Sequence, residues 1–193
     1  VYTISIRLGV LGIIYKYLKN ESSVHMPDQI KKKFHTYYLT FAARNALLSH
    51  ELLKILSILE GKRIMALPLK GPVLSDIIYG DDTLRVSSDL DIFVKDTDAI
   101  KARDILISLG YINVTPLDKK YDPFYLKIES AFSLLNPNNG INIDLQWKLL
   151  GIYTPAPITI SKIQKELITQ QYCGKTIYQL SKEDLLFYLC VHG

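Results

Sequence analysis

Two aspartates separated by a single residue form the part of this sequence best suited to chemistry. They lie in residues 87–94, which read Ser-Ser-Asp-Leu-Asp-Ile-Phe-Val. Side chains alternate between the two faces of a strand, so Asp89 and Asp91 would share one face while the apolar residues enter the core. At an effective dielectric of about 20, two carboxylates about 4 Å apart repel by roughly 4 kcal/mol. Such a pair either raises one pKa or binds a cation, and Mg²⁺ held by carboxylates and substrate phosphates would relieve the repulsion.

A third acid lies on a second alternating segment, residues 141–147. Its apolar face carries Ile141, Ile143, Leu145 and Trp147, and its polar face carries Asn142, Asp144 and Gln146. If this strand pairs near the first, Asp144 can join Asp89 and Asp91. Three acids on adjacent strands are able to hold two divalent ions for an in-line attack on a phosphoryl group. In the alternative interpretation, Asp89 caps a turn with Ser87 and Ser88, and Asp144 is an ordinary solvated strand residue.

A phosphate-type turn precedes the aspartate pair. Lys70 and Gly71 lie between a predicted strand, 64–69, and a predicted helix whose first residue is Pro72. A helix that begins directly after a glycine turn presents free backbone N–H groups, which can bind phosphate. Lys70 is then either a triphosphate contact or an ordinary lysine at the end of a strand.

Two further polar residues lie in the loop that leads to the aspartates. Arg85 is open to two roles, a phosphate contact or a salt bridge to an acid such as Asp82. Ser88 either shapes the turn or touches the substrate. Both residues therefore join the set of candidate substrate contacts.

Together these residues resemble the nucleotidyltransferases of the DNA polymerase β superfamily. The similarity is greatest to a branch of largely uncharacterised bacterial nucleotidyltransferases, which carry Lys-Gly, Arg-x-x-x-Asp-x-Asp and a later Asp-Leu-His-Trp. The matching elements here are Lys70-Gly71, Arg85, Ser88-Asp89-Leu90-Asp91 and Asp144-Leu145-Gln146-Trp147. Two positions depart from the pattern: Pro72 stands where the superfamily has Ser, and Gln146 replaces the His. The resemblance spans about 64–149 and extends more loosely to the C-terminal Leu-Cys-Val-His-Gly.

The resemblance implies a metal-dependent transfer of a nucleoside monophosphate from a nucleoside triphosphate such as ATP to an unidentified hydroxyl acceptor. Asp89, Asp91 and Asp144 would be catalytic and would bind two Mg²⁺ ions, with Mn²⁺ as a substitute. Asp144 would take the acceptor proton, directly or through water. The phosphate contacts would be Lys70, Gly71, Arg85 and Ser88. The base preference stays open, and nucleic acid stays open as a partner.

Two other functions are compatible with parts of the pattern. A glycosyltransferase also binds its metal through Asp-x-Asp, but there the apolar strand precedes the motif, whereas here it follows. The second alternative is a catalytically inactive module that binds a nucleotide or a protein on the same fold. Pro72 after Gly71 and Gln146 in place of His support this alternative.

Composition and spacing exclude several other classes. The 193 residues carry a net charge of +4 and are 48% hydrophobic, which suits a globular domain with an anionic substrate. The four His and two Cys residues have no metal-ligand spacing, and Gly174-Lys175-Thr176 lacks the earlier glycine of a P-loop. The first segment is too short an apolar run for a membrane span, and no cleavage site follows it. We expect a cytoplasmic protein with no membrane contact.

The sequence predicts an α+β fold, with a small mixed or antiparallel sheet of the polymerase-β-type nucleotidyltransferase core. Residues 1–62 would be an N-terminal helical region, 63–154 the core, and 155–193 a mostly helical region after which more helix would follow. Helices are predicted over 3–19, from Asp28 to a cap at Gly61, from Pro72 to Tyr79, from a cap at Thr97 or Asp98 to Gly110, over 162–171 and from Ser181 onward. Strands are predicted over 64–69, 89–94, 111–114, 128–135, 141–147 and 175–180, with a polar connection over 115–127 and a linker at 155–157.

Overall fold

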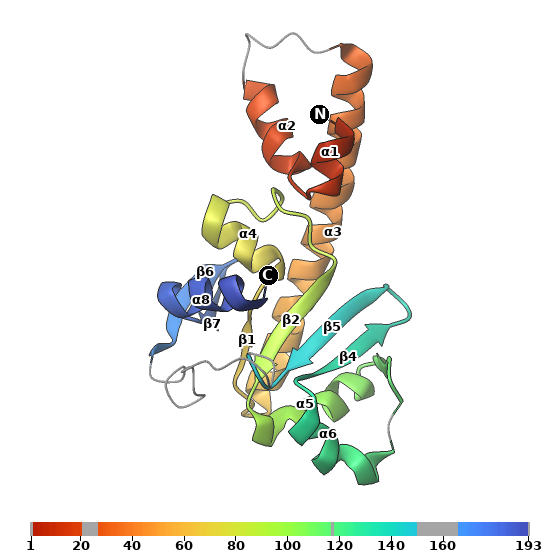
Figure 1. Ribbon diagram of the computed structural model, residues 1–193, viewed down its shortest axis with the longest axis vertical. Helices are drawn as coiled ribbons and strands as arrows, with labels where there is room; N and C mark the ends of the chain where they lie inside the picture. The colour runs from red at the N-terminus through yellow and green to blue at the C-terminus, as the bar shows by residue number, and fades with distance from the viewer. Residues whose placement is uncertain (1, 21–26, 117, 150–165, 193) are drawn as a thin grey trace. The chain divides into compact units, whose positions relative to one another are not determined.

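The computed structural model describes residues 2–20, 27–116, 118–149 and 166–192 (Figure 1). The chain divides into two compact units, which are described separately. Unit 1 comprises Val1–Glu51 and Lys70–Ser88, and unit 2 comprises Leu52–Leu69 and Asp89–Gly193. The predicted division into regions 1–62, 63–154 and 155–193 stays a prediction. Within the described segments, no helix is long and apolar enough to cross a membrane.

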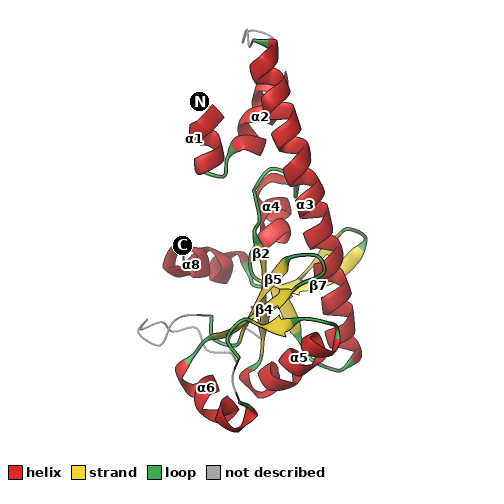
Figure 2. Ribbon diagram, turned by 90° about the vertical axis from the view of Figure 1, so that its right-hand side faces the viewer, coloured by secondary structure: helices red, strands yellow, loops and turns green. Residues whose placement is uncertain are grey.

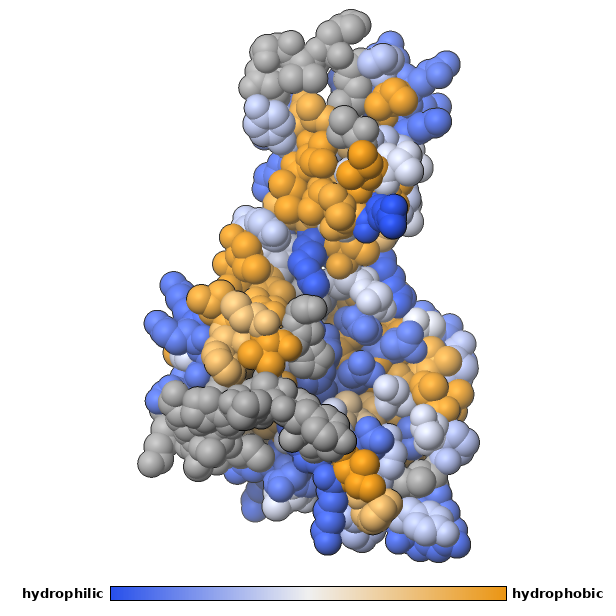
Figure 3. All heavy atoms as spheres, viewed as in Figure 1, coloured by the Kyte–Doolittle hydropathy of each residue, from blue (hydrophilic) through white to orange (hydrophobic). Residues whose placement is uncertain are grey.

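Unit 1 is built from helices. Its elements are α1 (Tyr2–Arg7), α2 (Leu11–Asn20), the first part of α3 (Asp28–Gly61) and α4 (Gly71–Tyr79). The single helix predicted over 3–19 is wrong, because the chain turns at Gly9, whose φ of 67° ends the first helix. Leu11, Tyr15 and Phe34 form the buried core between α2 and α3. Apolar residues also gather on the surface over α1 and α2 (Figure 3).

Helix α3 runs for 34 residues without a break (Figure 2). Phe34, Leu48, Leu52, Ile55 and Leu59 lie on one stripe of this helix, and all five are buried. The predicted cap at Gly61 is wrong: Gly61 is helical, and the left-handed residue that ends the helix is Arg63, with φ of 61°. The three lysines at 31–33 are solvent-exposed.

Unit 2 contains a five-stranded sheet in the order β1-β2-β5-β4-β3. The strands are β1 (Ala66–Pro68), β2 (Asp89–Val94), β3 (Ile112–Asn113), β4 (Ala131–Asn136) and β5 (Ile141–Gln146). Strand β2 pairs with β5 in parallel, and the other pairs are antiparallel. The mixed sheet predicted from the sequence is therefore confirmed.

One face of this sheet is a dry core. The residues that alternation assigns to it on β2, β5 and β4 are all buried: Leu90, Ile92, Val94, Ile141, Ile143, Leu145, Phe132 and Leu134. Helix α5 (Asp96–Ser108) contacts both β2 and β5 and begins earlier than the predicted caps at Thr97 or Asp98. This packing fixes the two strands that carry the three acids.

The connection at 115–127 is more ordered than predicted. It contains a short helical turn, η1 (Lys119–Tyr121), and helix α6 (Asp122–Ile128). The two terminal guanidinium nitrogens of Arg103 on α5, Nη1 and Nη2, donate to the buried carboxylate of Asp122 at the start of α6. The buried ion pair therefore anchors this segment to α5.

A second, two-stranded sheet corrects the prediction for the C-terminal region. Strand β6 (Ile168–Tyr172) pairs antiparallel with β7 (Lys175–Gln179), so the helix predicted over 162–171 is wrong from Ile168 onward. Residues 162–165 and the predicted linker at 155–157 lie outside the described residues. Helix α8 (Lys182–His192) follows, and the Oγ of Ser181 accepts a hydrogen bond from the backbone N–H of Asp184, as the predicted cap requires.

Candidate active site

The parallel pairing of β2 and β5 places two of the predicted acids side by side. The two strands lie side by side in Figure 1. Asp91 lies opposite Asp144, and Asp89 lies opposite Asn142. Residues in register on neighbouring strands share a face, so Asp89, Asp91 and Asp144 all belong to the polar face of the sheet. Asp144 therefore lies beside Asp91 and on the same sheet face as Asp89, as expected if the two strands pair.

Burial increases along this polar face from one end to the other. On β5, Asn142 is exposed, Asp144 is half-buried and Gln146 is buried. On β2, Asp89 is half-buried, Asp91 is 9% exposed and Phe93 is fully enclosed. The acids thus lie where the sheet surface passes from solvent into the interior, where charges interact more strongly than in water.

Asp144 is held from the side opposite Asp91. Ser133 on β4 lies directly across from it, and the Ser133 Oγ donates a 2.7 Å hydrogen bond to the Asp144 Oδ1. Asp91, Asp144 and Ser133 therefore form one row across three neighbouring strands. In the middle of this row, the Asp144 carboxylate is oriented by the Ser133 hydroxyl on one side and faces the Asp91 carboxylate on the other.

Asp91 is held from the buried end of the polar face. The Gln146 Nε2 donates a 2.8 Å hydrogen bond to the Asp91 Oδ1, and the Tyr188 hydroxyl of α8 donates to the Gln146 Oε1 at 3.5 Å. Burial raises the pKa of Tyr188, with a further rise from the negative charge of Asp91, so this phenol stays neutral. Gln146, which replaces the His of the resembling pattern, thus contacts one of the predicted metal ligands directly.

The donor set fits a divalent ion that shares its coordination with a substrate. Across the described residues, no three His, Cys, Asp or Glu side chains converge as a set of metal ligands. The register instead offers two neighbouring carboxylates, Asp91 and Asp144, with Asp89 further along the same face. Mg²⁺ is commonly held by one or two carboxylates together with substrate phosphates, and this oxygen-only set suits it.

Unit 1 contains the predicted phosphate turn. Helix α4 begins at Gly71, with Pro72 in its first turn and Lys70 at the N-cap. Gly71 adopts φ of 72°, a conformation that a residue with a side chain reaches only with strain. Lys70 gives this end of the helix no side-chain cap, and residues 71–75 of the helix are buried. Phosphate binding at this turn stays a prediction.

The loop that carries Arg85 and Ser88 is tied to α3. Asn45, fully buried on α3, donates its side-chain N–H to the backbone carbonyls of Asp82 and Arg85. The guanidinium of Arg44 donates to the carbonyl of Ser88 at 3.4 Å. Both roles that the sequence allows for Arg85, a phosphate contact and a salt bridge to an acid such as Asp82, stay predictions.

The hydroxyl of Ser87 takes no part in the turn that leads to Asp89. Its Oγ is buried and has no hydrogen-bond partner among the described atoms. Strand β2 begins at Asp89 immediately afterwards. Asp89 is therefore a strand residue in register with β5.

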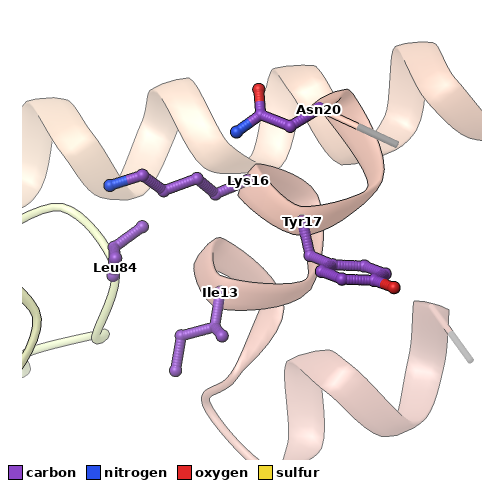
Figure 4. A pocket seen from close by; sticks show the side chains of 5 residues that line it. All are labelled: Ile13, Lys16, Tyr17, Asn20 and Leu84. Atoms are coloured by element: carbon purple, nitrogen blue, oxygen red, sulfur yellow. The ribbon is translucent and has the colours of Figure 1, made fainter. Parts of the chain in front are cut away.

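A pocket elsewhere in unit 1 lacks comparable groups. It has a volume of about 260 Å³ and lies between α2 and Leu84 (Figure 4). Among the described residues that line it, Lys16 alone is charged, and its ammonium group pairs with Asp81 at 2.9 Å. The acids on β2 and β5 remain the better candidate for catalysis.

Comparison with protein families identifies the class of enzyme. A family model described as uncharacterised nucleotidyltransferase matches residues 1–193. The chain belongs to this nucleotidyltransferase family. The family resemblance expected from the sequence is thereby confirmed, and the glycosyltransferase alternative loses its support. No curated protein matches the chain.

The fold of this nucleotidyltransferase also resembles that of a solved enzyme. The crystal structure of the lincosamide antibiotic adenylyltransferase LnuA with lincomycin bound is similar with a TM-score of 0.51 and 18% sequence identity. The match covers 72% of this chain and 83% of that chain. At this identity the comparison supports the α+β nucleotidyltransferase fold alone.

Sequence reasoning missed three polar residues that hold the candidate site residues of the nucleotidyltransferase. Ser133 carries a weak signal, since it is a polar residue on a strand predicted to join a hairpin with the Asp144 strand. Asn45 interrupts the apolar stripe of α3 between Phe41 and Leu48, which signals a buried polar contact. Tyr188 gives no such signal, because a tyrosine on an apolar helix is usually a core residue.

Proposed function

We propose that this nucleotidyltransferase transfers a nucleoside monophosphate from a nucleoside triphosphate to a hydroxyl group in a reaction that needs a divalent metal ion. The observation that carries the proposal is the in-register pairing of Asp91 with Asp144 on two parallel strands. Family membership supports nucleotidyl transfer, and the paired carboxylates supply a place for the metal. A cytoplasmic location stays a prediction.

The three acids have distinct roles in this proposal. Asp89 and Asp91 hold the metal and the phosphates of the nucleotide, and Asp144 shares the metal and takes the proton of the acceptor hydroxyl, directly or through water. Ser133 fixes the carboxylate of Asp144 through its 2.7 Å hydrogen bond. A divalent ion bound here, Mg²⁺ or Mn²⁺, would polarise the phosphoryl oxygens and lower the pKa of the acceptor hydroxyl.

The phosphate contacts form the second part of the proposal. Lys70, the N–H groups at Gly71, Arg85 and Ser88 would bind the triphosphate and stabilise the leaving pyrophosphate. The helix N-terminus favours negative charge, and Lys70 adds a full positive charge at the same turn. Pro72 has no hydroxyl to offer, so this turn must bind phosphate through backbone N–H groups and Lys70.

The acceptor is proposed to be a small molecule with a free hydroxyl group. The solved adenylyltransferase with this fold carries lincomycin, an antibiotic, and its match supports testing lincosamides and other hydroxyl-bearing antibiotics first. A protein side chain and the end of an RNA are the other acceptors to include.

Label transfer from α-³²P nucleotides tests the proposal. The wild-type protein, each of the four nucleoside triphosphates, Mg²⁺ or Mn²⁺ and a panel of acceptors should give labelled acceptor, and chelation by EDTA should abolish it. Asp89→Asn with Asp91→Asn, and separately Asp144→Asn, should lower the rate about a hundredfold or more, because several kcal/mol of charge stabilisation are lost. Asp96→Asn, an exposed acid at the start of α5, is the matched control and should keep wild-type activity.

Binding measurements address the inactive-module alternative. That alternative is favoured by Pro72 after Gly71, by the replacement of His at position 146 and by the lack of three converging metal ligands in the described chain. Calorimetry with Mg-ATP would then show tight binding without turnover on any acceptor. Transfer activity that survives in the Asp89→Asn plus Asp91→Asn protein would contradict the proposed site.

A further inference from the structure

We propose that Gln146 and Tyr188 are positioning residues that set the orientation of the Asp91 carboxylate for metal binding, an inference that rests on the proposed function. Neither residue is a candidate ligand or phosphate contact. Both lie in unit 2, on β5 and α8, and their hydrogen bonds run from the Tyr188 hydroxyl to the Gln146 amide and from that amide to Asp91.

The geometry assigns a direction to each hydrogen bond. A carboxylate only accepts, so the Gln146 amide must present its N–H to Asp91, at 2.8 Å. The amide oxygen then faces the opposite way, where the Tyr188 hydroxyl donates to it at 3.5 Å. Reversing the amide would place its oxygen against the Asp91 carboxylate, so the orientation is fixed from both ends.

Burial gives these contacts their effect. Gln146 is 5% exposed, Tyr188 is 0% exposed and Asp91 is 9% exposed, so water has little access to the chain of hydrogen bonds. A buried amide whose hydrogen bonds are lost cannot replace them with water. The two contacts therefore resist rotation of the Asp91 side chain, which is the requirement for a preorganised metal ligand.

The chemical types of the two residues suit positioning better than proton transfer. An amide neither gains nor loses a proton in the physiological range, so Gln146 donates to Asp91 at every pH at which the protein is folded. Tyr188 contacts Gln146, and its enclosure keeps the phenol neutral. Residues that orient metal-ligating carboxylates are typically worth about ten- to a hundredfold in metal affinity or activity.

A double-mutant cycle tests the inference. The variants are Gln146→Leu, Tyr188→Phe and the two combined, and the readouts are the Mn²⁺ affinity with a non-hydrolysable nucleotide analogue, kcat and the metal concentration for half-maximal rate. Gln146→Leu should weaken Mn²⁺ binding about ten- to a hundredfold. Tyr188→Phe should weaken it about two- to tenfold. Because Tyr188 acts through Gln146, the double variant should resemble Gln146→Leu alone.

Matched controls separate positioning from a general loss of packing. Gln179→Leu replaces a buried glutamine of β7, and Tyr172→Phe replaces a buried tyrosine of β6, both in the same unit. Thermal unfolding of all variants identifies losses of stability. The controls should leave the Mn²⁺ affinity and the metal dependence of the rate unchanged even where they lower the unfolding temperature.

Each outcome assigns success or failure to one of the two proposals. Suppose that the wild-type protein transfers the nucleotide and that Gln146→Leu binds Mn²⁺ as tightly as Gln179→Leu does. This result would overturn the positioning role alone. Additive effects of the two substitutions would overturn the link between Tyr188 and Gln146. Metal binding that weakens as expected, without transfer to any acceptor, would overturn the proposed reaction and keep the positioning role. A wild-type protein that binds neither Mn²⁺ nor nucleotide would overturn both.

Discussion

Asp144 is the residue on which the proposed chemistry depends most directly. It is flanked in register by Asp91 on β2 and Ser133 on β4. The neighbouring carboxylate favours a bound cation, whereas the hydroxyl determines where the carboxylate oxygens point. A general base must reach the proton that it abstracts in a defined geometry, so the Ser133 contact bears on the rate more than on the fold.

Ser133→Ala should therefore lower kcat with little change in stability. Removing the 2.7 Å hydrogen bond to Asp144 should cost about two- to tenfold in kcat. Because Ser133 is exposed, the free energy of unfolding should change by less than about 1 kcal/mol. Steady-state kinetics and urea unfolding measure the two effects. Ser108→Ala, whose hydroxyl donates to the carbonyl of Ile105 on α5, is the control, and an equal loss of kcat in it would contradict the assignment.

At the scale of elements, helix α2 packs closely on the loop after α4. Gly12 lies where an added Cβ would be 2.7 Å from the backbone oxygen of Leu84, a distance that real Cβ atoms essentially never show. The contact lies within unit 1 and involves backbone, which cannot move away as a flexible side chain can. The glycine is thus required by space, because its backbone does not adopt a left-handed conformation.

Gly12→Ala should destabilise the protein although alanine is the better helix former. The gain of about 1 kcal/mol in helix propensity is offset by an overpacking cost of about 1–3 kcal/mol, so the net change should be a loss. Gly61→Ala is the matched control, since Gly61 lies in α3 with nothing near the added Cβ, and it should be neutral or stabilising. Thermal unfolding distinguishes the two, and a Gly12→Ala protein as stable as Gly61→Ala would rule out the close contact.

The sequence predicts an element well where its side chains alternate cleanly between core and solvent. The bounds of β2 agree with the predicted 89–94 because two aspartates with one residue between them lead into the apolar run Ile92-Phe93-Val94, although all of the strand after Asp89 is buried. The same holds for β5, apart from its last residue. Strand β6 was predicted as helix because Ile-Thr-Gln-Gln-Tyr has no such alternation and its strand state depends on pairing with β7.

The candidate site was predictable in its acids but not in the residues that hold them. Asp89, Asp91 and Asp144 can be identified from their residue type and spacing, because carboxylates close together on one strand face repel one another unless they bind a cation or a proton. The hydrogen bond from Gln146 to Asp91 depends on the register of β5 against β2, and the approach of Tyr188 depends on how α8 packs. No local pattern encodes either of them. Whether the three acids act together in catalysis stays a prediction.

At the scale of the whole molecule, one carboxylate in each unit responds to acid in the same way. Burial alone would raise the pKa of Asp81 in unit 1, but hydrogen bonds from Thr83 and Lys16 outweigh it and lower this pKa. Burial would likewise raise the pKa of Asp104 in unit 2, but hydrogen bonds from Lys119 and Arg103 lower it. Each folded-state pKa lies below the ordinary value of 3.8.

Stability should therefore fall as the pH drops below about 4. The unfolded chain binds protons at these two carboxylates before the folded chain does, so their contribution is fully present above the unfolded pKa and is lost as pH falls through the folded one. Urea unfolding between pH 7 and pH 2.5 measures the loss. The combined Asp81→Asn and Asp104→Asn protein should lose less stability over this range than the wild type, and Asp96→Asn should follow the wild type. Identical pH dependence in all three would show that neither carboxylate contributes.

The graded burial of the polar sheet face limits the direction from which a substrate can enter. Gln146 and Phe93 close one end of this face, and the exposed Asn142 marks the other. In the proposed reaction, an acceptor hydroxyl at Asp144 would therefore have the remainder of its molecule extending towards Asn142. Acceptor analogues lengthened in that direction should be tolerated, whereas added bulk directed at Gln146 should be rejected. The transfer rates of a series of such analogues can therefore map this entrance.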